Sequence, residues 1–247
     1  MTAAAMIRYT HEKSMDERKG PLTLSIDVGG SGVKMMILDA AGQPLTERLR
    51  RKTPEQPTPS LVLDEIVPMA AEIGAFDRVS VGFPGVVVDG VTHTAVNLHN
   101  EWAGFDLRGV LMQRLGKDVR VANDADVQGL GVIEGIGVEL VLTLGTGIGA
   151  ALFTDGKLVP NLELGHHPFE RGNTYEERLS DQELRKKGKD TWNERLQRAI
   201  VILDRVFNYR VLYLGGGNAR KISFELPANV RIVSNVAGIL GGIRLWD

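Results

Sequence analysis

Two glycine-rich stretches carry residue types that suit phosphate chemistry. The first is Asp27-Val28-Gly29-Gly30-Ser31-Gly32-Val33-Lys34, which connects apolar runs over 22–26 and 33–38. Glycine has no Cβ, so backbone amides can approach an anion closely, and successive inward-pointing amides form a concave anion site. Asp27 ends the first run, where a carboxylate suits Mg²⁺ bound through water. The pattern predicts a hairpin with a phosphate-binding turn, and an ordinary tight hairpin is the alternative.

The same pattern occurs a second time. An apolar run over 140–144 leads into Gly145-Thr146-Gly147-Ile148-Gly149, and another apolar run over 150–153 follows. A single repeat at about half the chain length predicts two lobes of similar topology. Two phosphate loops that face each other across a cleft are typical of nucleotide kinases.

Further polar residues follow predicted strands, at the carboxyl ends where α/β sheets collect their ligand chemistry. Gly82-Phe83-Pro84-Gly85 follows a strand over 78–81. Asn123-Asp124-Ala125-Asp126 follows a strand over 119–122 and opens a helix expected to run through Glu134. Asp124 is a candidate for the chemistry. In the alternative, Asp124 and Asp126 only complement the helix dipole.

A metal site is suggested by the pair His166-His167. However, the chain has no cysteine, and the other histidines, His11, His93 and His99, lack the spacing of metal ligands. No structural zinc is therefore expected.

The remaining elements follow from periodicity and capping residues. We expect a strand over 45–52, and its basic run Arg48, Arg50, Arg51 and Lys52 is typical of a solvated face. Ser60 is a candidate cap for a helix that Pro68 should kink or break. Asp106 is the expected N-cap of a helix over 107–115, which Gly116 closes.

The second half of the chain is expected to contain a charged helix over 173–187 and an amphipathic helix over 191–207. Apolar residues spaced along one face of the second helix should be core. Strands are expected over 211–214 and 231–233, and a closing helix from Asn235 through Ile243.

Composition limits the classes of function. A chain of 247 residues can hold one large domain or two small lobes, and its net charge of −2 offers no bulk attraction to nucleic acid or membrane. No apolar run approaches the roughly 20 residues needed to cross a bilayer. The absence of cysteine excludes disulfides and thiolate metal sites. Because no export signal is visible, a cytoplasmic location is expected. Residues 1–20 are polar and aperiodic, which predicts a disordered tail too short for a helix-turn-helix domain.

Seven motifs, in order, resemble those of the ROK family of sugar kinases within the actin-like ATPase superfamily. They are Asp27-Val28-Gly29-Gly30-Ser31, Gly82-Phe83-Pro84-Gly85, Asn97-Leu98 with Trp102, Asn123-Asp124-Ala125, Leu144-Gly145-Thr146-Gly147-Ile148-Gly149, Glu163-Leu164-Gly165-His166 and Gly215-Gly216-Gly217. The resemblance implies an α/β, two-lobed actin-like (ribonuclease H-like) ATPase fold, each lobe a mixed sheet flanked by helices. The expected lobes are residues 21–122 and 123–234, with a helix over 235–247 packing back on the first lobe.

One departure from the family narrows the resemblance. Most ROK members have a cysteine-rich zinc segment after the motif that contains His166, whereas this chain has Tyr175-Glu176-Glu177-Arg178-Leu179-Ser180 there. With the compact length and the helix start over 190–196, this is most similar to the polyphosphate-dependent glucokinase branch. Glu176 matches the Glu that binds sugar in other members, and the next residue, Glu177, is the alternative match.

The resemblance implies a role for each motif in a transfer to the 6-hydroxyl of glucose. Asp124 would accept the hydroxyl proton, late in the transfer because a carboxylate of ordinary pKa is a weak base. Asp27 would orient Mg²⁺. The sugar would be bound by Asn97, Asn123, Asp124, Glu163, His166 and Glu176. The phosphates would be bound by Gly29, Gly30, Ser31, Lys34, Gly145, Thr146 and Gly147, and a nucleoside by Gly215, Gly216 and Gly217.

The phosphoryl donor is expected to be polyphosphate, with ATP also used, and an ATP-only kinase is the alternative. A basic track for polyphosphate could come from Lys34, Arg178, Arg185, Lys186, Lys187 and Lys189, although solvated helix faces have the same composition. A kinase for another hexose or an N-acetylated sugar is also open. A non-catalytic sugar sensor is disfavoured because it needs neither Asp27 nor Asp124. The resemblance implies a homodimer.

Overall fold

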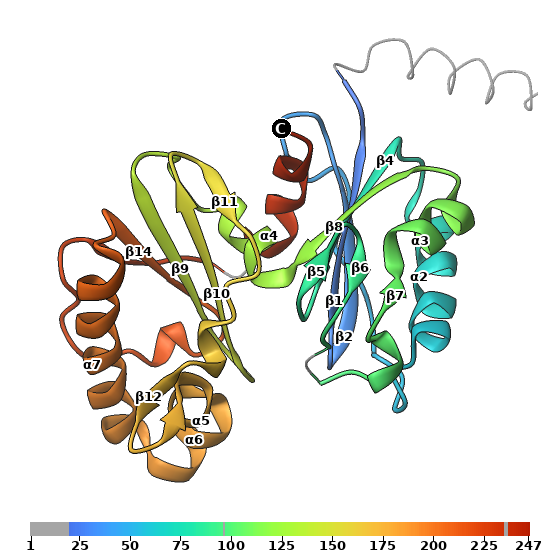
Figure 1. Ribbon diagram of the computed structural model, residues 1–247. Coiled ribbons are helices and arrows are strands. Elements are labelled where there is room, and N and C mark those ends of the chain that lie inside the picture. Colours follow the sequence, from blue (N-terminus) through green and yellow to red (C-terminus); the bar gives the residue numbers. More distant parts are fainter. Residues whose placement is uncertain (1–19, 96, 235–236) are drawn as a thin grey trace, which may run out of the picture.

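The computed structural model describes residues 20–95, 97–234 and 237–247 (Figure 1). The predicted disordered tail, except for Gly20, lies outside the described residues, as do the first two residues of the predicted closing helix. Figure 1 shows two sheets side by side, with α4 and the C-terminal segment between them at one end. None of the described helices is long and apolar enough to cross a membrane.

The first sheet is built on the first predicted hairpin. Its strand order is β3-β2-β1-β4-β8. The strands are β1 (Thr23–Gly29), β2 (Gly32–Leu38), β3 (Leu49–Arg51), β4 (Arg78–Phe83) and β8 (Asp118–Asn123). β1 pairs antiparallel with β2 and parallel with β4, which in turn pairs parallel with β8. β3 is shorter than the strand predicted over 45–52.

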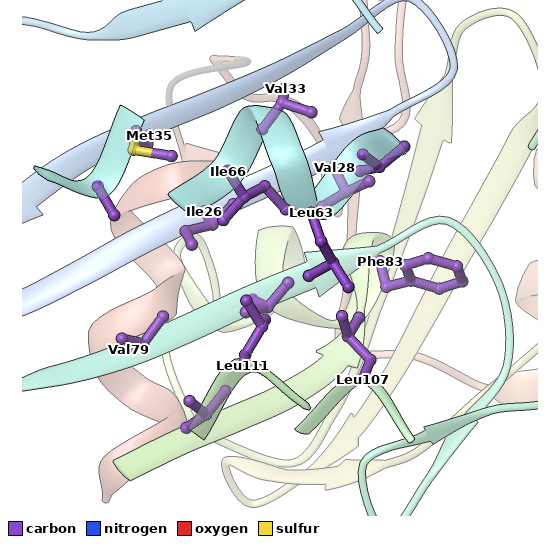
Figure 2. Packing of buried hydrophobic residues seen from close by; sticks show 14 of the residues in the cluster. Ile26, Val28, Val33, Met35, Leu63, Ile66, Val79, Phe83, Leu107 and Leu111 are labelled. Atoms are coloured by element: carbon purple, nitrogen blue, oxygen red, sulfur yellow. The ribbon is translucent and has the colours of Figure 1, made fainter. Parts of the chain in front are cut away.

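Alternation along β1 separates a core face from a polar face. Leu24, Ile26 and Val28 are buried on the face covered by α2 (Pro59–Ile73) and α3 (Leu107–Leu115), and Figure 2 shows part of this packing. Ser25 and Asp27 therefore point to the opposite face, because successive strand residues alternate. That opposite face is the one that meets the rest of the molecule.

Helix α2 corrects the predicted N-cap and is not broken at Pro68, where the sequence predicts a kink or a break. Its N-cap is Thr58, whose hydroxyl accepts from the Leu61 N–H, rather than Ser60. The helix also continues through Pro68. Pro68 is exposed, so the carbonyl that it leaves without an N–H partner lies on the solvent side, while the buried face holds the helix against the sheet. Helix α3 has the bounds and both caps that the sequence predicts.

The second sheet repeats the order of the first, as β11-β10-β9-β14-β15. The strands are β9 (Val138–Leu144), β10 (Ile148–Thr154), β11 (Lys157–Val159), β14 (Val211–Gly215) and β15 (Val230–Ile232). The hairpin β9–β10 is antiparallel, and β14 pairs parallel with β9 and β15. Helix α7 (Lys189–Phe207) covers one face with Trp192, Leu196, Ile200 and Leu203, which confirms the predicted apolar stripe.

Two predicted helices are shorter or divided because tertiary partners take their backbone groups. The helix predicted over 173–187 is α5 (Tyr175–Leu179) and α6 (Asp181–Lys187), separated by Ser180 in an extended conformation. The Asp181 N–H there donates to the Gly145 carbonyl at 2.9 Å. Helix α4 (Asp124–Leu130) ends before Glu134, because the N–H groups of 134–136 donate to the buried Glu139 carboxylate.

Smaller elements connect these layers. They are β5 (Val87–Val88), β6 (Val91–Thr92), η1 (Asn100–Trp102), β7 (Phe105–Asp106), η2 (Leu164–His166), β12 (Pro168–Glu170), β13 (Asn173–Thr174) and η3 (Ala219–Lys221). The turn between β5 and β6 lies at Asp89-Gly90.

The C-terminal segment comprises α8 (Ala237–Leu240) and η4 (Gly241–Trp246) and packs on β1 and β4 of the first sheet. The Ser25 hydroxyl donates to the Ile239 carbonyl, and the Ser80 hydroxyl to the Gly242 carbonyl, both at 2.6 Å. The predicted lobe boundary between residues 122 and 123 remains a prediction.

Candidate active site

A cleft of about 560 Å³ brings both glycine-rich turns together. Every residue predicted to bind phosphate lines it, from the β1–β2 hairpin on one side and the β9–β10 hairpin on the other. So does every predicted sugar-binding residue. Of the three glycines predicted to bind a nucleoside, Gly216 lines the cleft, and Gly215 and Gly217 are not among its described lining residues.

The first turn requires glycine at position 30. A Cβ there would lie 2.9 Å from the Cβ of Asn97 and 3.1 Å from its carbonyl oxygen. Asn97 itself has a positive φ of 60°, which asparagine tolerates better than most residues. The turn is also tied to the following loop, because the Thr53 hydroxyl donates to the Gly29 carbonyl at 2.5 Å.

Asp27 and Lys34 face each other across β1 and β2 and form an ion pair of 2.6 Å. No group of three or more His, Asp or Glu side chains in the described part of the chain could hold a metal ion. Mg²⁺ usually takes one or two carboxylates, several waters and the substrate phosphates. Asp27 at the cleft wall fits that limited requirement, with Lys34 as a second positive group for the phosphates.

Asp124 begins α4 at the end of β8 and lines the cleft. The helix is capped by Asn123, whose Oδ1 accepts from the Ala125 N–H at 2.8 Å and from the Asp126 N–H at 3.3 Å. Burial, and next the negative charge of Asp27, raise the pKa of Asp124 from 3.8 to about 7, although the Ala125 N–H opposes the shift. The expectation of an ordinary pKa is therefore wrong. The lining of the cleft removes water from this carboxyl and makes its ionised form a stronger base.

Three of the predicted sugar-binding residues, Asn123, Glu163 and His166, form a connected polar row. The Asn123 amide donates to the Gly85 carbonyl at 3.1 Å and to Glu163 Oε1 at 3.4 Å. Glu163 Oε2 lies 3.4 Å from Nε2 of the exposed His166. Burial raises the pKa of Glu163, and His166 opposes that shift. Amide, carboxylate and imidazole groups in one row offer both donors and acceptors, which suits a sugar.

Glu176 contacts the second turn directly. Its Oε2 accepts from the Ile148 N–H at 3.0 Å. A Cβ at Gly147 would overlap the same carboxylate, so a side chain there would displace Glu176 from this contact. The predicted role of Glu176 in binding sugar stays a prediction, and its observed contact fixes the turn between β9 and β10.

Known proteins resemble this chain over most of its length. The profile of the ROK family matches residues 23–185. The chain belongs to the ROK family. It is 33% identical over 235 residues to "Polyphosphate glucokinase" from Mycobacterium leprae, covering 87% of this chain and 72% of the relative. It is 32% identical over 234 residues to the protein of that name from Mycobacterium tuberculosis (strain CDC 1551 / Oshkosh), covering 87% of this chain and 88% of the relative.

Among solved structures, the chain is similar to an inorganic polyphosphate/ATP-glucomannokinase from Arthrobacter sp. strain KM. The two share 36% identity and superpose with a TM-score of 0.83 over 92% of this chain and 100% of the other. The predicted fold class is confirmed: this ROK chain has the two-lobed actin-like ATPase fold.

One residue beside this ROK site, Asn161, was missed in the sequence. The Asn161 side chain pairs with strand β5, since its amide donates to the Val87 carbonyl and its Oδ1 accepts from the Val87 N–H, both at 2.9 Å. The Asn161 N–H donates to Oδ2 of the buried Asp126 at 3.1 Å. Pro160-Asn161 is a turn signal, but neither partner can be inferred from it. Asp126 therefore does more than lie in the first turn of α4, because it also accepts a hydrogen bond from a residue far along the chain.

Two of the cations in the predicted basic track of this ROK chain lie in ion pairs with acidic side chains. Arg178 lies 3.7 Å from Glu183, and Arg185 lies 2.7 Å from Asp181. Arg185 and Lys186 line a groove of about 610 Å³ that shares Asn97, Thr146 and Glu176 with the cleft. Among the described residues, Lys187 and Lys189 line neither hollow.

Proposed function

We propose that this chain transfers a phosphoryl group from polyphosphate to the 6-hydroxyl of glucose. The chain is a phosphotransferase that acts on a sugar hydroxyl. Glucose as acceptor and polyphosphate as donor are the finer statements that we propose. Both are supported by the names of the mycobacterial and Arthrobacter relatives, which cover most of the chain.

One observation carries the mechanism: an acid with a pKa raised to about 7 lies in a cleft between two glycine-rich turns. Phosphoryl transfer asks a protein mainly to position groups and neutralise charge. The amides of the two turns and the Lys34 ammonium bind the donor phosphates. Asn123, Glu163 and His166 orient the sugar so that its hydroxyl points at the terminal phosphorus.

Asp124 then accepts the hydroxyl proton while the oxygen forms its bond to phosphorus and the bond to the rest of the donor breaks. A base whose pKa lies near the working pH is efficient in this role. Mg²⁺, when bound near Asp27, would neutralise charge on the phosphates. The predicted homodimer and cytoplasmic location remain predictions.

A second candidate donor is ATP, and a specific observation favours it. Gly216, which directly follows β14, lines the same cleft as the phosphate turns, and this supports a nucleoside site beside them. The Arthrobacter relative is named for both donors and for mannose as well as glucose. Donor and sugar specificity are therefore tested together.

The experiment is a coupled assay for glucose 6-phosphate, with polyphosphate or ATP as the sole donor and glucose, mannose or N-acetylglucosamine as acceptor. We expect turnover of glucose with polyphosphate, and a loss of about a thousandfold in kcat for Asp124→Ala. Glucose should still bind this variant in calorimetry. Asp190→Ala, which removes an exposed acid in the first turn of α7, is the matched control. If no product forms from polyphosphate, polyphosphate is excluded as the donor. If Asp124→Ala turns over near the wild-type rate, Asp124 is excluded as the base.

A further inference from the structure

The edge strand β3 divides its basic residues between two faces. The Arg51 guanidinium lies 3.2 Å from Glu65 and 2.8 Å from Glu72, both on α2. Arg50 must point to the opposite face, since successive strand residues alternate. The basic run therefore does not behave as a single solvated face.

Arg50 lies in a cross-strand row that leads out of the cleft. In the sheet register, Arg50 is opposite Lys34, and Lys34 is opposite Asp27. Directly opposite residues share one face of a sheet. Asp27 and Lys34 line the cleft, so Arg50 lies on the cleft face one strand further out. Two inter-strand spacings separate Arg50 from Asp27, about 10 Å.

The Arg50 guanidinium also lies against the first phosphate turn. A Cβ built on Gly32 would lie 2.9 Å from Arg50 Nε and 3.4 Å from its Nη2. Glycine at position 32 therefore leaves room for the guanidinium beside the turn. This contact brings Arg50 close to the amides that are proposed to bind phosphate.

The charge of Arg50 is uncompensated. Its side chain is exposed and forms no ion pair or hydrogen bond with any described residue. The alternative route over α6 differs, because its groove holds the cations Arg185 and Lys186 together with the carboxylates of Glu176, Glu177 and Asp181. A polyanion is attracted to the uncompensated cation and repelled by the acidic groove.

We propose that Arg50 binds the phosphate groups of the donor that lie beyond the transferred one, so that a polyphosphate chain leaves the cleft past Lys34 and over the edge of the first sheet. This rests on the proposed function, in which polyphosphate is the donor. A planar guanidinium can bind phosphate oxygens through two parallel hydrogen bonds. Donors too short to span from the reacting phosphate to β3 should not depend on Arg50.

The test compares Arg50→Ala and Arg50→Lys with two control variants. Arg48→Ala removes an exposed cation just before β3, and Lys186→Ala removes one from the α6 groove. For Arg50→Ala we expect a rise of about tenfold in KM for long-chain polyphosphate at low salt, with a smaller rise as salt screens the charge. The KM for tripolyphosphate should rise less than that for long-chain polyphosphate, because the short donor extends less far past the first phosphate turn, and the KM for glucose and kcat at saturating donor should not change. Arg50→Lys should recover part of the loss.

Three results would overturn the assignment of Arg50. These are an equal effect in Arg48→Ala, an equal loss with tripolyphosphate, or a larger effect in Lys186→Ala, which would direct the chain over α6. Calorimetric binding of long-chain polyphosphate to the full chain without sugar separates this inference from the proposed function. Wild type could bind polyphosphate about tenfold more tightly than Arg50→Ala and yet make no product from it. In that case polyphosphate is not the donor, but the inference that Arg50 binds polyphosphate is supported. If both proteins bind polyphosphate equally tightly, Arg50 does not bind the donor.

Discussion

At the scale of single residues, two acids on one helix differ in role because they face different surroundings. Asp124 lines the cleft, and burial, together with the charge of Asp27, raises its pKa to about 7. Asp126 is two residues further along α4, is only 1% exposed, and holds the Asn161 N–H. The first carboxyl is available to a substrate, whereas the second holds a loop.

The raised pKa of Asp124 predicts the pH dependence of catalysis. The carboxylate must be ionised to accept a proton, so kcat/KM for glucose should rise with pH up to about 7 and level off above it. The measurement is the pH–rate profile of the wild type, with Asp190→Ala as control. An acidic limb centred near 4 would contradict the raised pKa.

At the scale of elements, the segment after β11 links the second sheet to α4 and to β5, which belongs to the separate three-stranded sheet β5-β6-β7. The Asn161 side chain is hydrogen-bonded to Val87 of β5, and the Asn161 N–H donates to Asp126 of α4. Two residues later the same segment presents Glu163 to Asn123. The position of the sugar-binding row thus depends on one loop held at both sides.

The buried Asp126 predicts a pH-dependent stability. Burial raises its pKa from 3.8 to about 7. Between these values the folded chain keeps a proton that the unfolded chain loses, so the free energy of unfolding should fall as pH rises through this window and stay reduced above it. Asp126→Asn keeps an acceptor for the Asn161 N–H without the charge. We expect it to match wild type near pH 4 and to be more stable at pH 8 by up to about 4 kcal/mol, at about 1.4 kcal/mol for each unit of the raised pKa.

Urea denaturation at both pH values measures this difference. Asp190→Ala, an exposed acid, should show the wild-type pH dependence. A variant destabilised equally at pH 4 and pH 8 would mean that the Asp126 charge carries no cost and that only its shape matters.

At the scale of the whole molecule, the C-terminal segment packs between the first sheet and α4. It covers Ser25 and Ser80 on the polar face of the first sheet, two residues before Asp27 and Gly82. It also contacts α4 through its backbone, because a Cβ at Gly241 would overlap the Val127 carbonyl and lie 2.8 Å from the Gly131 nitrogen. The last residues of the chain therefore set the distance between the first sheet and the helix that carries Asp124.

Gly241→Ala should accordingly affect both stability and catalysis. The added methyl group must push α4 away from the segment, which we expect to cost about 1–3 kcal/mol in free energy of unfolding and to lower kcat more than it changes the KM for glucose. Thermal or urea unfolding and steady-state kinetics measure the two effects. Gly217→Ala, where a Cβ meets no atom within 4 Å, is the control for stability and should change it by less than about 0.5 kcal/mol. An unchanged kcat in Gly241→Ala would show that α4 is not positioned by this contact.

The sequence by itself determined the features that neighbours along the chain encode. Alternating apolar runs around Gly29-Gly30 and Gly145-Gly147 specify the two hairpins, Asp106 and Gly116 specify both ends of α3, and the position of Asp124 after β8 specifies a strand end. Each follows from burial period, turn chemistry or capping, which act over a few residues.

Tertiary structure alone decided the properties that depend on partners far along the chain. Asn161 meets Val87 across 74 residues of sequence, Glu176 reaches Ile148 across 28, and Asp181 reaches Gly145 to divide a helix that the local pattern leaves whole. The pKa of Asp124 rises because the packed cleft removes its water and brings Asp27 near. The physical reason is that desolvation and long-range contacts arise only when the two halves of the chain come together around the cleft, and no local pattern carries that information.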